Sequence, residues 1–468
     1  MLIALIETVT KKSRYTYPHT GLGYIAAVLE RDGNEVVILD MDFHREQSNI
    51  NRLSSEIDVV GVSATSFTFR QCLDILSRVK SINRETITIM GGAHTIIAMQ
   101  DILQHEQVDY VIYGEGELTS TNLTRVLREN LRPKRRELAN INGLIFRDNG
   151  EIVINPPQLR IKDLNKVPFP AFHLWDMKNY PAYPLITSRG CPYNCVFCSA
   201  SVIWGATWLP RSPSNIIEEI KHAQKYYYAK YKLFVVEDDS FNISIPRALE
   251  FCEQLIKNKI KIEWACTGIR ANLITFELAE SMKRAGCVSV NVGIESADPA
   301  ILKNINKGET LEEITKGINI LSKAGIPVSA SFVIGNPGDN LETTKRTMEF
   351  IKTTPLVNST FYLAVPYPKT KLWAYIEKHG RFLGDDYTEF HHMKEKPSFD
   401  TPEFSFADRQ IAYKLTKKFA SRRRLRNLFK IFLLNVRGAS PRKMVSFSRM
   451  AKRVLARELK ILFRKDKA

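Results

Sequence analysis

Short apolar runs rich in valine and isoleucine alternate with helical stretches along most of this 468-residue chain. The first third carries five such runs, at residues 2–7, 35–40, 58–64, 86–92 and 109–117. Alternation of strands and helices is typical of a parallel sheet that helices cover on both faces. We therefore predict an α/β fold with an N-terminal doubly wound domain, of the flavodoxin or Rossmann type, over residues 1–145.

The alternation resumes after a predicted linker at 146–182, which is rich in proline and aromatic residues (VPFPAFHLWDM). Six strands follow, at residues 183–190, 231–239, 260–270, 288–296, 328–338 and 359–368. Six strand–helix units suffice for a partial (β/α)6 barrel, which we place at 183–400. Residues that carry function are expected at the carboxyl ends of its strands.

Composition and hydropathy do not indicate a membrane-spanning protein. Hydrophobic residues make up 44% of the chain, and no run approaches the roughly 18 apolar residues that a spanning helix needs. The first residues, MLIALIET, lack a basic segment and a cleavage site, so we expect a buried strand rather than a signal peptide. Seven cysteines, three of them clustered, suit a reducing compartment, and we expect a cytoplasmic protein.

The net charge of +17 is concentrated at the C-terminal end. Residues 409–468 hold 20 lysines and arginines against two acids, and the other 408 residues are almost neutral. Apolar residues recur at helical spacing in 417–434 and 447–463, which predicts a basic amphipathic helical region at 401–468. Such helices can lie on anionic membrane surfaces, so we expect peripheral contact with the inner face of a membrane. The alternative is that the apolar stripes pack on the barrel.

The loop SRGCPYNCVFCSA (188–200) brings three cysteines, Cys191, Cys195 and Cys198, within eight positions. The next cysteine along the chain is Cys252. Three thiolates can bind three irons of a cubane cluster and leave the fourth iron open for an exogenous ligand. The alternative is a zinc site that a distant histidine completes.

Small and polar residues collect at the carboxyl ends of the N-terminal strands, where ligands of doubly wound sheets bind. They are Ser63, Thr65, Gly91, Gly92, Gly114 and Glu115. Glycines there let a large planar ligand approach the backbone closely. Neither GxxxxGK(S/T) nor GxGxxG occurs, which argues against a phosphate-binding loop. The alternative is a flavodoxin-like domain whose glycines serve only its turns.

The ordered motifs PHTGLGY, VGVSAT, GGAH and YGEGE, followed by the cysteine loop, resemble the cobalamin-binding radical S-adenosylmethionine (SAM) enzymes. The resemblance implies a cobalamin-binding domain at 1–145, with the six strand-end residues above at the cobalamin, and a radical SAM barrel at 183–400. It implies three cofactors, which are cobalamin, SAM and a 4Fe-4S cluster on the clustered cysteines.

The histidine motif DxHxxG of other cobalamin proteins is absent after the first strand. We therefore expect cobalamin to bind without a histidine ligand, with the loop at 63–67 near its lower face. His44 and His94 are expected to be surface or loop residues.

Further positions match the SAM-binding motifs of the family. They are Phe197, Glu237, Asp238, Asp239, Arg270, Glu295, Gly335 and Pro337. The resemblance implies that Phe197 and the turn at 335–338 lie at the adenine, that an acid at 237–239 contacts the methionyl ammonium, and that Glu295 binds the ribose. Which of the three acids makes that contact stays open.

Alternation along the strand at 260–270 places Trp264, Cys266, Gly268 and Arg270 on one face. Arg270, at the carboxyl end, is expected to reach the SAM carboxylate. Cys266 either faces the cavity or is buried in the barrel wall. Cys72, Cys252 and Cys287 are expected to be structural.

The resemblance implies reductive cleavage of SAM to a 5′-deoxyadenosyl radical, with electrons from an external donor. The radical would modify an unactivated carbon, by methylation, on a lipid or natural-product substrate. The first alternative is oxidative cyclisation of the anaerobic cyclase type. An RNA-modifying enzyme is less favoured, because no RNA-binding module is recognisable, and we expect no nucleic acid partner. A cobalamin- or redox-responsive binding protein is the remaining alternative.

Overall fold

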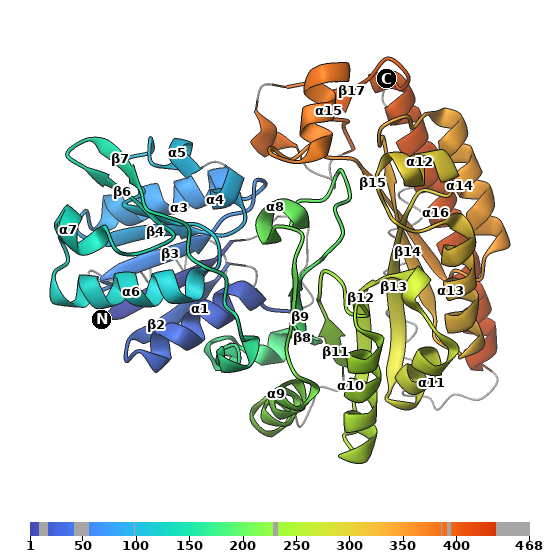
Figure 1. The fold of residues 1–468 in the computed structure, drawn as a ribbon, viewed down its shortest axis with the longest axis horizontal. Coiled ribbons are helices and arrows are strands. Elements are labelled where there is room, and N and C mark those ends of the chain that lie inside the picture. The colour runs from blue at the N-terminus through green and yellow to red at the C-terminus, as the bar shows by residue number, and fades with distance from the viewer. Residues whose placement is uncertain are drawn as a thin grey trace.

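The computed structural model describes residues 1–8, 17–41, 56–97, 99–227, 233–384, 386–390 and 395–436. These residues form two large sheets with helices around them, which lie side by side in Figure 1. Short segments of 3-10 helix connect several elements, at Leu164–Lys166, Phe172–Leu174, Met177–Asn179, Ala271–Leu273 and Tyr387–Glu389. His44 and the apolar stripe at 447–463 lie outside the described residues.

The first sheet has the strand order β2-β1-β3-β4-β5-β6-β7 within the described residues. The strands are β1 (Leu2–Glu7), β2 (Glu35–Asp40), β3 (Val59–Ser63), β4 (Ile87–Gly91), β5 (Tyr110–Ile112), β6 (Leu144–Asp148) and β7 (Glu151–Ile154). The first five run parallel, and β6 and β7 add an antiparallel hairpin at one edge. The sheet therefore continues past residue 145, where the sequence analysis ends the domain.

Helices cover both faces of this sheet, as predicted. They are α1 (Thr20–Arg31), α3 (Phe69–Ile82), α4 (His94–Ile97), α5 (Met99–Ile102), α6 (Gly116–Glu129) and α7 (Arg135–Leu138). Strand β1 shows why two layers form: Ile3 and Leu5 belong to the core shared with α1 and α6, whereas Ala4 and Ile6 belong to the core shared with α3. A strand that is buried on both faces reads as a continuous apolar run, which LIALIE does. The predicted doubly wound α/β domain is confirmed.

The second sheet has the order β15-β14-β13-β12-β11-β8 in the part of the chain that the structure describes, and all its pairs are parallel. Its strands are β8 (Tyr183–Leu185), β11 (Leu233–Val236), β12 (Glu263–Ile269), β13 (Cys287–Glu295), β14 (Val328–Ile334) and β15 (Asn358–Leu363). The outer helices are α9 (Pro213–Tyr226), α10 (Ile245–Lys257), α11 (Phe276–Arg284), α12 (Pro299–Asn304), α13 (Leu311–Lys323) and α14 (Leu341–Thr353). The predicted partial (β/α)6 barrel is confirmed.

Smaller elements surround the ends of the barrel. A short antiparallel pair joins β9 (Ser188–Gly190) to β10 (Trp208–Pro210), with α8 (Ala200–Trp204) between them. Near the C-terminal side, α15 (Lys371–His379) is followed by the pair of β16 (Arg381–Phe382) and β17 (Phe399–Asp400). In Figure 1, β9 and α8 lie between the N-terminal sheet and the barrel, on the side of the barrel where β8 forms the edge of its sheet.

Alternation in the barrel strands separates an inner face from a face that packs on helices. In β14, Ala330 and Phe332 are buried, whereas Ser329 and Ser331 are only partly buried. In β12, Trp264 and Cys266 are both on the buried side, and the indole of Trp264 packs against Phe251 of α10. Cys266 is therefore a buried residue of the barrel wall, the second of the two interpretations left open by the sequence.

Helix α16 (Phe406–Val436) begins the region predicted as a basic tail, and it packs on the barrel against β15 and α14. Its arginines bind the barrel: Arg423 donates to the backbone carbonyl oxygen of Leu356 at 2.7 Å, and Arg424 donates to the side-chain Oδ1 of Asn358 at 3.1 Å. This helix is therefore part of the barrel, and Ala412, Tyr413 and Ala420 of it belong to the barrel core. None of the described helices combines the length and the hydropathy that crossing a membrane requires.

His94 is buried, which corrects its assignment to the surface or a loop. It is the first residue of α4, its side chain is fully enclosed, its Nδ1 lies 3.2 Å from Ser66 Oγ, and its ring lies 4.3 Å from that of Phe69. Burial lowers the pKa of His94 to about 4. The sequence did not predict this burial, because it depends on the GGAH turn, which places the His94 ring against Phe69 at the start of α3.

We predict that His94 makes the stability of the N-terminal domain sensitive to acid. Its folded-state pKa lies below the unfolded value, so the unfolded state binds more protons between the two, and stability falls as pH drops through this window. His94→Gln should remove about 2 kcal/mol of the loss between pH 7 and pH 5. Urea unfolding at both pH values measures the difference. The exposed His379→Gln is the control, and an equal acid loss in wild type and His94→Gln would contradict the assignment.

Candidate functional site

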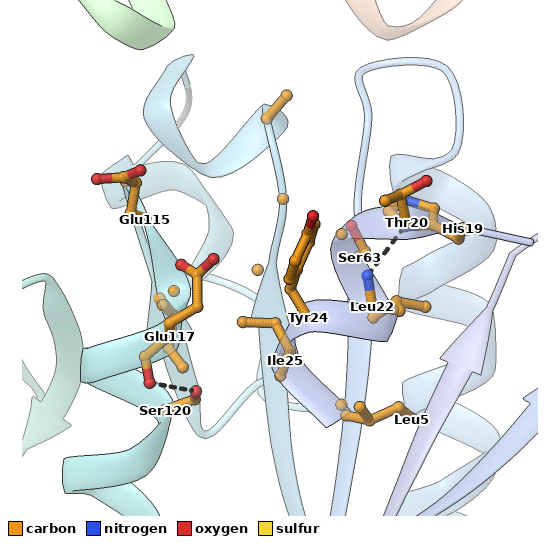
Figure 2. A pocket seen from close by; sticks show the side chains of 18 of the residues that line it. Leu5, His19, Thr20, Leu22, Tyr24, Ile25, Ser63, Glu115, Glu117 and Ser120 are labelled. Atoms are coloured by element: carbon orange, nitrogen blue, oxygen red, sulfur yellow. Dashed lines mark hydrogen bonds between the residues drawn. The ribbon is translucent and has the colours of Figure 1, made fainter. Parts of the chain in front are cut away.

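A cavity of about 470 Å³ lies between the N-terminal sheet and the start of the barrel. Its lining includes all six strand-end residues that the sequence analysis proposed for cobalamin: Ser63, Thr65, Gly91, Gly92, Gly114 and Glu115. Figure 2 shows Glu115 and Glu117 on one side of the cavity and His19 and Thr20 on the other, with Tyr24 between them. The parallel sheet brings these residues together because the carboxyl ends of its strands meet at one edge.

The loop around Ala64 and the loop at 91–94 are held together by backbone contacts. Gly92 has a φ of 99°, and a Cβ at this position would lie 2.6 Å from the carbonyl oxygen of Ala64. Backbone hydrogen bonds join Ala64 to Gly91 at 2.8 Å and to His94 at 3.0 Å. The backbone of both loops is therefore exposed to the cavity in a fixed arrangement. This bare cradle fits a large flat ligand such as a corrin ring, which needs close approach to the main chain.

The barrel supplies the facing wall of the same cavity, which sequence reasoning missed. The lining residues from this side are Ile186, Ser188, Arg189, Ile203, Trp204, Glu237 and Asp239. Arg189 donates to Glu115 Oε1 at 2.9 Å and to Glu117. Glu115 thus lines the cavity, but its carboxylate is occupied by the protein, since its second oxygen accepts the backbone N–H of Ile161 at 2.8 Å.

The cysteine loop follows β9 directly and carries three partly buried thiols. Gly190, just before it, has a φ of 87°, and a Cβ there would lie 2.2 Å from the carbonyl oxygen of Thr207. Within the loop, the backbone of Val196 donates to Ile305 at 3.0 Å and accepts from Leu372 at 2.8 Å. The loop is therefore held by three distant segments of the barrel, so its thiols occupy defined positions.

Burial raises the pKa of Cys191, Cys195 and Cys198, that of Cys198 to about 11. Among the described residues, no group of three or more His, Cys, Asp or Glu side chains is arranged to hold a single metal ion. An iron–sulfur cubane takes one thiolate for each iron, so its ligands need not converge on one point. Three thiols on a braced, partly open loop fit such a cluster.

The three acids after β11 have separate environments, which bears on which of them is available to contact the ammonium of SAM. Asp238 is buried, and it accepts hydrogen bonds from the backbone N–H of Thr187 at 2.6 Å and from the Ser188 hydroxyl at 2.6 Å. Its carboxylate is thus committed to the protein. Glu237 and Asp239 line the cavity instead, and burial raises the pKa of both.

Arg270, which is expected to reach the SAM carboxylate, makes several contacts with the protein. Its guanidinium stacks 3.5 Å from the ring centre of Tyr193, in the cysteine loop, and donates to the carbonyl oxygen of Lys307 at 2.8 Å. It also lies 3.4 Å from Glu309. Arg270 therefore braces the cysteine loop from the neighbouring strand end.

Lys307 and Glu309 are site residues that the sequence analysis missed. The Lys307 ammonium lies 3.4 Å from Glu295 and 3.5 Å from Glu309, and all three side chains are largely buried. Glu295 has a φ of 69°, next to a register shift between β13 and β14. Burial raises the pKa of Glu295, and Lys307 opposes this shift. The signal was the short run KGE, which follows GIES by only 11 residues.

The turn at 335–338 ends β14, and α16 holds it from behind. The buried Arg409 donates to the carbonyl oxygen of Gly335 at 3.0 Å, and Asp339 accepts the Gly335 N–H at 2.7 Å. The carbonyl of Pro337 accepts from Asn304 at 3.0 Å. Phe197, between Cys195 and Cys198 in the cysteine loop, is half-buried and packs against the hydrophobic core.

Comparison with known families agrees with this division of the chain. Residues 185–351 match the radical SAM superfamily, and residues 6–124 match the B12 binding domain. The first match covers the barrel from β8 into α14, and the second covers the N-terminal sheet as far as α6.

Three relatives illustrate the range of similar proteins. The chain is 32% identical over 368 residues to the uncharacterized methyltransferase PH0819 of Pyrococcus horikoshii, covering 77% of this chain and 78% of that protein. It is 25% identical over 400 residues to the anaerobic magnesium-protoporphyrin IX monomethyl ester cyclase of Rubrivivax gelatinosus, covering 82% and 69%. It is 26% identical over 338 residues to the hopanoid C-2 methylase of Rhodopseudomonas palustris, covering 71% and 60%.

Two solved structures share the whole arrangement. OxsB, a cobalamin-dependent SAM radical enzyme solved with aqua-cobalamin and SAM, has a TM-score of 0.68 at 20% identity, covering 98% of this chain and 72% of that one. TsrM from Kitasatospora setae, with cobalamin and a 4Fe-4S cluster, has a TM-score of 0.65 at 18% identity, covering 79% and 76%. The resemblance stated from the motifs is confirmed: the chain belongs to the cobalamin-dependent radical SAM enzymes, whose cofactors are a 4Fe-4S cluster, SAM and cobalamin.

Proposed function

We propose that this protein transfers a methyl group from SAM, by way of bound cobalamin, to an unactivated carbon of a small-molecule or lipid substrate. The observation that carries the proposal is the shared cavity: Ser188 and Arg189 at the start of the cysteine loop, together with Asp239, line the same space as the N-terminal glycine cradle. Groups bound at the two sites would therefore lie next to each other. The relative with the highest identity quoted above is named a methyltransferase.

The reduced cluster and cobalamin would supply, when bound, the electron that cleaves SAM and the carrier for its methyl group. The chain's own residues bind and orient. Cys191, Cys195 and Cys198 would hold the cluster, and the acids that face the cavity, Glu237 and Asp239, are the candidates for the ammonium of SAM. Glu295, set by its left-handed backbone and by Lys307, is the candidate for the ribose hydroxyls.

Cyclisation is the second candidate, because the cyclase of Rubrivivax gelatinosus is also similar over most of the chain. The two activities differ in the products they leave from SAM. A methyltransferase yields both 5′-deoxyadenosine and S-adenosylhomocysteine, whereas a cyclase yields only 5′-deoxyadenosine. No nucleic acid partner is proposed.

We predict that the reconstituted protein, incubated without oxygen with cobalamin, dithionite and SAM, forms both 5′-deoxyadenosine and S-adenosylhomocysteine. The combined replacement of Cys191, Cys195 and Cys198 by alanine should abolish cluster absorbance and 5′-deoxyadenosine together. Cys266→Ala, in the barrel wall, should keep both. Formation of 5′-deoxyadenosine alone would favour cyclisation, and formation of neither product by wild type would contradict the proposal.

We predict that Gly92→Ala weakens cobalamin binding by at least about tenfold, because its Cβ would force the Ala64 loop out of the cradle. Gly33→Ala is a matched control, since Gly33 has a φ of 82° but open space where a Cβ would be. Equilibrium dialysis of the unreconstituted protein with hydroxocobalamin measures both. Equal affinities for the two variants would argue against the cradle.

We also propose peripheral contact with anionic membranes through the basic residues beyond α16. Residues 437–468 hold 11 lysines and arginines against Glu458 and Asp466. Clusters of basic residues are attracted to anionic lipid headgroups. Such contact would bring the active site to a lipid substrate.

Removal of residues 437–468 should weaken binding to vesicles that contain phosphatidylglycerol, and leave cluster absorbance unchanged. The cut must follow Val436, because a cut at residue 408 would remove the buried Arg409 and the helix that covers β15. Vesicle co-sedimentation at low and high salt gives the comparison, with pure phosphatidylcholine vesicles as the control. Unchanged binding of the shortened chain would rule out this contact.

A further inference from the structure

Arg189 connects the two halves of the site. It lies in β9, one residue before Gly190 and two before Cys191, and it pairs across to Leu209 of β10. Its side chain leaves the barrel and ends between carboxylates of the N-terminal domain. The residue therefore belongs by its backbone to the cysteine loop and by its guanidinium to the wall of the cobalamin cavity.

The contacts of the guanidinium are made with two acids at the start of α6. Nη1 donates to Glu115 Oε1 at 2.9 Å, and Nη2 donates to Glu117 Oε1. Only 10% of the Arg189 side chain is exposed, and Glu115 and Glu117 are 5% and 8% exposed. The guanidinium also lies 5.1 Å from the ring centre of Tyr24 in α1. Both contacts are charge-assisted and shielded from solvent, so loss of the guanidinium would leave two buried carboxylates without their counter-ion, which costs more than breaking a surface ion pair.

One of the two acids extends the connection to a third segment. Glu115 Oε2 accepts the backbone N–H of Ile161 at 2.8 Å, and Arg160 approaches it to 4.0 Å. The Arg160 guanidinium lies over the ring of Trp204 in α8, at 5.1 Å from its centre. The N-terminal domain, the connecting segment and the helix after the cysteines thus meet at Glu115.

The backbone on either side of Arg189 is fixed to the barrel. Ser188 donates to the buried Asp238 at 2.6 Å, and the N–H of Gly190 donates to Asp239 at 3.0 Å. The left-handed backbone of Gly190 also packs against Thr207. Because these neighbours cannot move independently, the position of α6 relative to the cysteine loop is set through the Arg189 side chain.

We propose that Arg189 is a positioning residue that keeps the cobalamin cavity in register with the cysteine loop, so that its loss uncouples methyl transfer between the sites from SAM cleavage at the cluster. The inference rests on the proposed function. Arginine is needed here because its planar guanidinium donates to Glu115 and Glu117 at the same time. Lysine carries the same charge but cannot bind two carboxylates in a fixed geometry.

SAM gives two products, which report on the two sites separately: 5′-deoxyadenosine on the cysteine loop, and S-adenosylhomocysteine on the transfer of a methyl group to the cobalamin cavity. 5′-Deoxyadenosine would form where a cluster on the three cysteines gives SAM one electron: the bond between sulfur and the 5′ carbon breaks, methionine leaves, and the deoxyadenosyl radical takes a hydrogen atom from a C–H bond of the substrate or of a buffer component. S-adenosylhomocysteine would form where reduced cobalamin in the cavity supplies the electron pair for the new bond to the methyl group, while the pair of the broken bond stays on the sulfur. Dithionite is the reductant for the formation of both products. Only the formation of S-adenosylhomocysteine requires alignment of the two sites.

The experiment compares wild type, Arg189→Gln, Arg189→Lys and Arg125→Gln as reconstituted full-length proteins with cobalamin, SAM and dithionite. For Arg189→Gln we expect normal cluster absorbance, 5′-deoxyadenosine within about twofold of wild type, and a ratio of S-adenosylhomocysteine to 5′-deoxyadenosine that falls about tenfold. Arg189→Lys should give an intermediate ratio. Arg125 also lies on α6, but its side chain is 59% exposed and pairs with Asp32 at the end of α1, away from the cavity lining, so Arg125→Gln should match wild type.

A second readout needs no turnover. Hydroxocobalamin binding to the unreconstituted proteins, measured by equilibrium dialysis, should weaken about tenfold in Arg189→Gln and stay unchanged in Arg125→Gln. An unchanged product ratio together with an unchanged affinity for hydroxocobalamin in Arg189→Gln would overturn the inference. Loss of cluster absorbance in both Arg189 variants would also overturn it, since Arg189 would then only maintain the structure of the cysteine loop. If wild type itself forms neither product, the proposed function fails, and the binding assay still tests Arg189.

Discussion

One buried carboxylate fixes the place where the two parts of the site meet. Asp238, at the end of β11, accepts hydrogen bonds from the backbone and hydroxyl of Thr187 and from the hydroxyl of Ser188. A buried charge is tolerated only where hydrogen bonds replace its water, so this contact forms as a unit or not at all. Because the cysteine loop starts a few residues later, the cluster site and the barrel wall of the cavity both depend on it.

Local patterns predicted the fold, and they proposed candidate ligand-binding residues that the structure brings together around one cavity. The cysteine spacing and the glycines at strand ends are short-range signals, and parallel strands bring such ends together whatever the helices do. Side-chain partners could not be predicted, because they depend on directions taken after a strand ends, where alternation no longer applies. Thus Asp238 turns toward Thr187 while Asp239 lines the cavity, and a strand face shared by Trp264 and Cys266 does not reveal which side the helices cover.

Long-range contacts were beyond the sequence for a related reason. Lys307 reads as an ordinary surface lysine, and Arg409 reads as the first charge of a basic tail, yet both are buried against the site. Each is matched: Lys307 lies between Glu295 and Glu309, and Arg409 donates to backbone and side-chain oxygens. An ion pair serves Lys307 and hydrogen bonds to neutral oxygens serve Arg409, so neither buried charge is left without partners.

The cavity has one wall from each domain, so it exists only when the domains are docked. A molecule that fills it binds the docked arrangement and not the separated one, and by mass action it stabilises docking by a free energy that rises with the logarithm of its concentration. Cobalamin in this position would serve as a structural bridge as well as a reagent. Without it, the docking would rest on protein contacts alone, such as the ion pairs that Arg189 makes with Glu115 and Glu117.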